Sequence, residues 1–209
     1  MKTHRAYMFS LLFYIIASFG VSLTIKASIG VSALNSTIVA LSEVLSFKVG
    51  TIMIAVNLIF LFAYMVLTKF KYTSKYILQA IFFLLFGSLV NLYLYEVLIY
   101  INTSYYLARI FLLISGVLIG GLSIGIIIHY NLITFPIESF CMELEHLTNK
   151  KFAFYRYGLD VFLALLSISI SLVFELPLFL REGTVVSVLL LTASMNFSKS
   201  KMQNVYLKN

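Results

Sequence analysis

One pattern occurs twice in this sequence, and its two copies lie 103 positions apart. In each copy an apolar run ends, a short break follows, and a short amphipathic segment leads to a lysine before the next apolar run begins. The copies cover residues 25–57 and 128–160. Their identity is low, so the repeat is one of pattern and position. Because internal repeats constrain architecture more strongly than local signals do, this one sets the expected fold.

The residues that this shift superposes share type or polarity. The matched pairs are Ile25 with Ile128, Asn35 with Glu138, Ser36 with Ser139, Leu41 with Leu144, Lys48 with Lys151 and Asn57 with Asp160. Polar residues therefore recur at corresponding depths in the two copies.

The composition identifies the solvent. Hydrophobic residues make up 61% of the chain, charged residues 11%, and the mean hydropathy is +1.01. A water-soluble core cannot bury that much apolar surface, so we expect the surrounding solvent to be lipid. The 15 basic residues outnumber the 8 acidic ones, but they lie between apolar runs and at the termini, which argues against nucleic-acid binding. The single cysteine, Cys141, excludes an internal disulfide.

Apolar runs define the expected spans. We expect six runs to cross the bilayer, and they cover about residues 7–25, 49–68, 76–100, 107–128, 154–174 and 183–197, of which the last is short. The first run follows Lys2 and Arg5 as a signal peptide would, but its length and the later spans favour a retained helix. Two shorter helical segments, 31–46 and 137–148, reach only about 20 Å. We expect each to be an amphipathic or re-entrant helix.

The expected fold is therefore all-α: one polytopic membrane domain over residues 1–209 with about six transmembrane helices. Residues 7–100 and 107–198 form two three-helix repeats, each with one short helix. Three spans per repeat is an odd number, so the second repeat enters the membrane upside down relative to the first, as in many transporters. Lysine and arginine placement favours both termini on the cytoplasmic side of the cytoplasmic membrane.

The sequence from Ile25 to Asn35, Ile-Lys-Ala-Ser-Ile-Gly-Val-Ser-Ala-Leu-Asn, followed by Phe-Lys-Val-Gly-Thr ending at Thr51, resembles the YczE/YyaS/YitT family of bacterial membrane proteins. Arg156 and Asp160, four residues apart, fit the counterpart in the second half. The resemblance implies a bacterial multi-pass protein with internal duplication and suspected transport or export. Aspartates of the family fall here on Ser28, Asn35, Asn131 and Glu138. An acidic pair that coupled ions in the first half would thus be lost.

Asp160 is the strongest candidate for a substrate or ion site. It lies about six residues inside an apolar span, and Arg156 is one turn earlier on the same face. A charge in lipid costs about 2.5–3.5 kcal/mol on insertion scales, so it requires a reason. The alternative is a structural ion pair near the cytoplasmic interface, with Arg156 extending toward water.

Other polar residues of the two copies are secondary candidates. Glu138 begins a short helix, where the helix dipole favours an acid; the preferred interpretation is a capping carboxylate that faces water. Asn35 and Asn57 are the amide counterparts of Glu138 and Asp160, and Asn91 and Asn196 pair the third and sixth spans. These residues either form a polar seam for substrate or only join helices by hydrogen bonds.

The function we expect is transport of a small molecule or ion by rocking of the two inverted halves. The alternative is a membrane regulatory or scaffold protein with no transported substrate. No motif of catalysis, nucleotide binding or metal ligation occurs, so we expect no enzyme, no catalytic residue, no cofactor and no metal. The expected partners are the lipid bilayer and an unknown substrate; the sequence leaves a homo-oligomer open.

Overall fold

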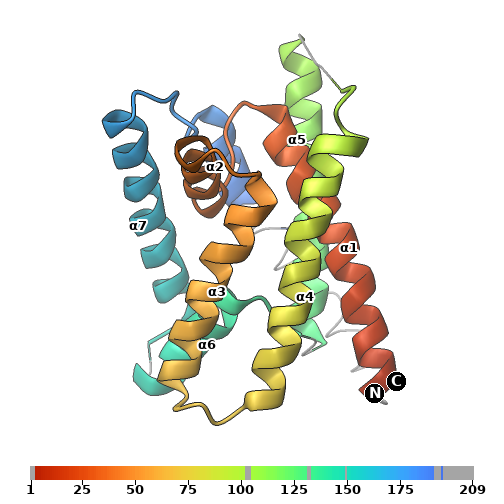
Figure 1. Ribbon diagram of the computed structural model, residues 1–209, viewed down its shortest axis with the longest axis vertical. Helices are drawn as coiled ribbons and strands as arrows, with labels where there is room; N and C mark the ends of the chain where they lie inside the picture. Colours follow the sequence, from red (N-terminus) through yellow and green to blue (C-terminus); the bar gives the residue numbers. More distant parts are fainter. Residues whose placement is uncertain (1–2, 102–104, 131–132, 149, 191–193, 195–209) are drawn as a thin grey trace. The chain divides into compact units, whose positions relative to one another are not determined.

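The computed structural model describes residues 3–101, 105–130, 133–148, 150–190 and 194 (Figure 1). Every regular element in these ranges is helical. The elements are α1 (Thr3–Ala27), α2 (Ala33–Leu45), α3 (Val49–Leu67), α4 (Thr73–Leu92), a π-helix η1 (Tyr93–Val97), α5 (Tyr106–His129), α6 (Pro136–Thr148) and α7 (Phe152–Val173). Residues 182–190 are also helical.

Within the described ranges, five helices are long and apolar enough to cross a membrane, which confirms the expectation of a membrane-embedded helical protein. They are Tyr7–Ala27, Val49–Leu67, Thr73–Val97, Tyr106–Ile128 and Phe152–Val173. Each matches an expected run to within a few residues. The sixth expected run, 183–197, lies partly outside the described part of the chain.

The two short helices occur where the sequence predicts them. α2 and α6 have 13 residues each, and α6 begins at Pro136, the position that proline tolerates best. Thirteen residues of helix measure about 20 Å, too little for the roughly 30 Å hydrocarbon layer. Small and polar side chains, among them Ser36 and Thr37, are buried on α2 beside Ile38, whereas Leu45 is exposed. Small residues let neighbouring helices approach closely, and leucine suits lipid.

The helices of the second half begin 103 residues after those of the first. α5 begins at 106 and α1 at 3; α6 begins at 136 and α2 at 33; α7 begins at 152 and α3 at 49. By contact, however, the chain divides into two compact units that each take segments from both halves. One unit comprises Met1–Ser32, Leu89–Leu132 and Arg181–Asn209, and the other comprises Ala33–Ser88 and Ile133–Leu180.

The first unit is organised around α1 and α5, whose backbones touch through glycines. A Cβ on Gly20 would lie 2.6 Å from the backbone nitrogen of Gly120, and one on Gly116 would lie 2.6 Å from the carbonyl oxygen of Gly20. Near the end of α1 the chain turns at Gly30, which has a φ of +115°. The Gly183 amide donates a 3.0 Å hydrogen bond to the carbonyl of Ile29. Gly116 and Gly120 of α5 thus permit a close approach of the two helix backbones.

The second unit packs α2 against α7 and α3 against α6. In Figure 1, α2 and α6 lie toward opposite ends of the long helices α3 and α7. An apolar cluster of Ala33, Ile137 and Leu163, with Leu34 and Phe60 packed on it, fills the interior.

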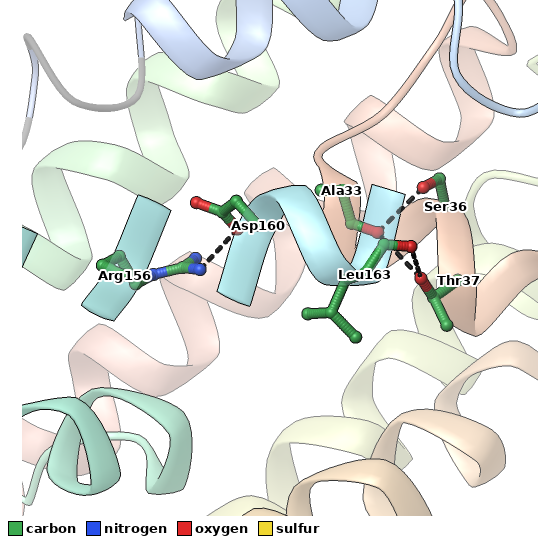
Figure 2. A network of polar contacts seen from close by, with 6 residues as sticks. All are labelled: Ala33, Ser36, Thr37, Arg156, Asp160 and Leu163. Atoms are coloured by element: carbon green, nitrogen blue, oxygen red, sulfur yellow. Dashed lines mark hydrogen bonds and ion pairs between the residues drawn. The ribbon is translucent and has the colours of Figure 1, made fainter. Parts of the chain in front are cut away.

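Thr37 on α2 donates a 2.7 Å hydrogen bond to the main-chain carbonyl of Leu163 in α7 (Figure 2). This bond fixes a polar group that the packing of α2 against α7 buries.

Candidate functional site

The first two turns of α7 carry an ion pair. Arg156 Nη1 donates to Asp160 Oδ1 over 2.5 Å, and the two residues are four apart, so they share one face of the helix (Figure 2). Their side chains are only 19% and 22% exposed. The pairing of Arg156 with Asp160 on one helical face agrees with the sequence prediction.

Glu138, in the first turn of α6, interacts electrostatically with both members of this pair and is buried, with 6% of its surface exposed. The prediction of a capping carboxylate that faces water is therefore wrong. Within the described ranges, Glu138 Oε2 is buried and has no hydrogen-bond partner. The sequence could not indicate this burial, because a glutamate in a first helical turn is usually solvated and favoured by the dipole.

Electrostatics connect Glu138 to both members of the pair. Burial raises the pKa of Glu138 above its ordinary value of 4.5; the charge of Arg156 opposes this rise and that of Asp160 adds to it. With both acids ionised, the three side chains carry a net charge of −1. An excess charge in a poorly hydrated site is costly, so the cluster favours uptake of a proton or of another cation.

Cys141 belongs to the same surroundings. It lies three residues after Glu138 on α6, and its side chain is fully buried. Burial raises the pKa of its thiol to about 12, with a further rise from the charge of Glu138. A thiol with such a pKa is inert toward electrophiles, so Cys141 acts as a small packing residue in this conformation.

Two predicted asparagines lie in the same unit as this cluster. Asn57 on α3 is 2% exposed, and its Nδ2 donates 3.1 Å to the carbonyl of Met53 in the same helix. Asn35 on α2 is partly buried. The hydrogen bond of Asn57 therefore lies within α3 and joins no second helix. Its buried side chain contributes polarity to the interior of the unit.

The other two asparagines are not brought to this cluster. Asn91 belongs to the first compact unit, and Asn196 lies outside the described residues. Their expected pairing is also wrong by two positions, because a shift of 103 superposes Asn91 on Ser194.

A buried amide that the sequence prediction missed joins α4 to the segment before α6. Gln79 Nε2 donates to the carbonyl of Thr134 at 2.9 Å and to Ser139 Oγ at 2.6 Å. Gln79 is fully buried, and its Oε1 lacks a hydrogen-bond partner within the part of the chain that the structure describes. A lone glutamine inside an apolar span was the available signal, since polar groups at that depth seek partners.

These features define a helical protein of membrane type with a buried charged cluster between a short helix and a long one. The model of a family of unknown function, DUF6198, matches residues 4–200 of the 209, and the chain belongs to that family. No curated protein and no solved structure matches the chain.

Proposed function

We propose that this protein transports a small molecule or ion across the cytoplasmic membrane and that Glu138, Arg156 and Asp160 form its binding site. The observation that carries the proposal is a cluster of one buried acid, Glu138, with a partly buried pair of an acid and a guanidinium, Asp160 and Arg156. In a chain of apolar helices, ionisable groups that face the protein interior are costly and commonly mark substrate or ion pathways.

The proposal includes two inverted repeats, and reciprocal contacts support it. The shift of 103 positions that relates the two repeats superposes Thr37 on Phe140 and Phe60 on Leu163. Thr37 bonds to Leu163, and the rings of Phe60 and Phe140 pack at 6.0 Å between centroids. The same shift exchanges Leu34 with Ile137 and Phe60 with Leu163, and all four residues belong to one apolar cluster. A two-fold relation between the repeats accounts for both observations.

The reciprocal packing changes which parts would move. The expected mechanism was rocking of one half against the other. Each compact unit, however, takes helices from both halves, and α2 packs on α7 while α3 packs on α6. Separating the halves would break these contacts inside the second unit. We therefore propose that the units, rather than the halves, are the bodies that move.

Six spans in an inverted repeat put both termini on one side of the membrane, which the lysine and arginine placement makes the cytoplasmic side, and they put two connections on opposite sides. We expect Thr73→Cys to react with an impermeant thiol reagent only from the cytoplasmic face and Tyr105→Cys only from the other. Both wild-type residues are exposed. The Cys141→Ala background supplies the unlabelled control. Labelling of both positions from one face would exclude the inverted repeat.

We also propose kinship with the YczE/YyaS/YitT family on the motif described above.

The alternative function, a regulatory or scaffold protein without a transported substrate, is tested by access to the site. A scaffold has no need to open its interior to both sides of the membrane, whereas a transporter has to open it to each side in turn.

The native Cys141 reports this opening without any new side chain. We expect it to react slowly with a small impermeant methanethiosulfonate in right-side-out and in inside-out vesicles, because each open state hydrates the site and lowers the thiol pKa. Cys141→Ala gives the background in both preparations. Reaction from one face only, or from neither after long exposure, would favour the scaffold.

A further inference from the structure

The cluster around Glu138 has one carboxylate more than it has cations, and this excess indicates its ligand. We infer that Glu138, beside Asp160, binds a monovalent cation in exchange for the proton that Glu138 carries when no cation is present. The inference rests on the proposed transport function and specifies its coupling. The exchange is balanced: the Glu138 O–H bond breaks, the proton leaves to water, and the cation takes its place against the carboxylate.

The geometry provides an acceptor that no side chain satisfies. Arg156 donates to Asp160 across the 2.5 Å ion pair, so the charges of these two groups largely cancel. Glu138 Oε2 is buried and without a partner among the described residues. The backbone amide of Glu138 donates to its own carboxylate, but an ionised carboxylate accepts several hydrogen bonds or metal contacts, and a buried oxygen without any of them is strongly disfavoured. The empty acceptor thus requires a proton or a bound cation.

The sign and size of the charge select the ligand class. An anion would add a second excess negative charge, since Arg156 is already neutralised by Asp160. A divalent cation would reverse the net charge to +1 rather than cancel it. One monovalent cation restores neutrality, as one proton does. Both an alkali ion and a protonated primary amine fulfil this requirement. The amine would donate N–H hydrogen bonds to the carboxylate, whereas the alkali ion would contact the carboxylate oxygens directly.

The titratable groups that act on Glu138 come from α7 and from α6 itself. α7 contributes Arg156 and Asp160, and α6 contributes Cys141. The one titratable side chain of α3, Tyr64, accepts a 3.1 Å hydrogen bond from Lys75 of α4, so that cation is already engaged by the Tyr64 hydroxyl. Among the groups that act on Glu138, Arg156 alone carries a positive charge, so a neutral cluster depends on the proton or cation at Glu138.

Proton release on cation binding tests the inference directly. Purified full-length protein in detergent, weakly buffered near neutral pH, receives sodium, potassium or methylammonium chloride while a pH dye records released protons. We expect at least one of these salts to release up to about one proton per chain. Tetramethylammonium chloride at equal ionic strength serves as the salt control. Release by alkali ions alone, or by methylammonium alone, assigns the source of the cation.

Two matched carboxyl-to-amide variants locate the proton. We expect Glu138→Gln to abolish the release and Glu43→Gln, at an exposed position of α2, to preserve it. Release that persists in Glu138→Gln, or no release from wild-type protein with any of the three salts, overturns the inference.

A stability measurement on wild-type protein keeps the test independent of whether Glu138→Gln folds. The pKa of Glu138 is raised in the folded state, so folded protein binds more protons than unfolded protein above about pH 4.5. The stability that Glu138 contributes is therefore greatest at low pH and declines as pH rises toward the folded pKa. We expect the releasing cation to raise the unfolding temperature more at high pH than at low pH. An equal or opposite effect contradicts the inference.

Binding and transport are separable by these results. Cation-dependent proton release with Cys141 accessible from one face only would retain the cation site and reject transport. Access from both faces without proton release would retain transport and reject this ligand.

Discussion

Gly116→Ala is expected to destabilise the protein, whereas Gly120→Ala, one turn further along α5, is expected to leave it unchanged or slightly more stable. A Cβ on Gly116 would lie 2.6 Å from the carbonyl oxygen of Gly20 and 2.9 Å from the Thr24 amide nitrogen. These are backbone atoms of α1, so the clash is relieved only by moving the helices apart. Overpacking of this kind costs about 1–3 kcal/mol.

Gly120 is the matched control, because a Cβ there meets nothing within 4 Å among the described residues. Alanine also favours helix over glycine by about 1 kcal/mol, which sets the direction expected at a site without a clash. Thermal unfolding of the two variants in detergent, with the monodisperse fraction on a sizing column, compares them. Equal losses of stability would mean that α1 and α5 do not meet through these glycines.

The positions of the helices were largely predictable from the sequence. In a chain of this hydropathy, each apolar run of about 20 residues has to satisfy its backbone internally and becomes a helix. The breaks were equally visible: Gly30 ends the segment after α1, and Pro136 opens α6. The shift of 103 between the copies predicts the starting residues of α5, α6 and α7 from those of α1, α2 and α3.

Burial was much less predictable, because hydrophobicity loses its meaning as a burial signal in lipid. On α2 the apolar Leu45 is exposed, whereas Ser36 and Thr37 are buried together with Ile38. The sequence likewise gave no indication that Glu138 turns inward or that Thr37 bonds to Leu163. These outcomes depend on packing between separate helices, 126 residues apart in the case of Thr37 and Leu163, and no local pattern encodes such contacts.

The pairing of Arg156 with Asp160 was the exception, since four-residue spacing on a helix is a local property. The division into two units that cross the repeat boundary was not foreseen, because it follows from which helices pack together. The candidate site was therefore predictable on α7 and unpredictable where α6 completes it.

Arg156 and Asp160 give the most direct comparison between a structural pair and a binding site. We expect Arg156→Leu to be the most damaging single change, with a loss of about 3–5 kcal/mol, because it leaves two partly buried acids without a cation. Asp160→Asn is expected to be milder in stability, since Glu138 can ionise against the guanidinium that remains. The double variant Arg156→Leu/Asp160→Leu should be close to wild type in stability, because apolar residues replace an ion pair at little cost. Membrane abundance and thermal unfolding measure all three.

Function is expected to follow a different order from stability. Asp160→Asn removes the excess negative charge, so its cluster is neutral without a proton or cation to exchange. The double variant keeps Glu138 but loses the second acid beside the proposed ligand. We therefore expect both to lose cation-dependent proton release and access to Cys141 from both faces, although both remain folded. A double variant that retains these two properties at wild-type levels would reduce the pair to a structural role and leave Glu138 as the sole binding group.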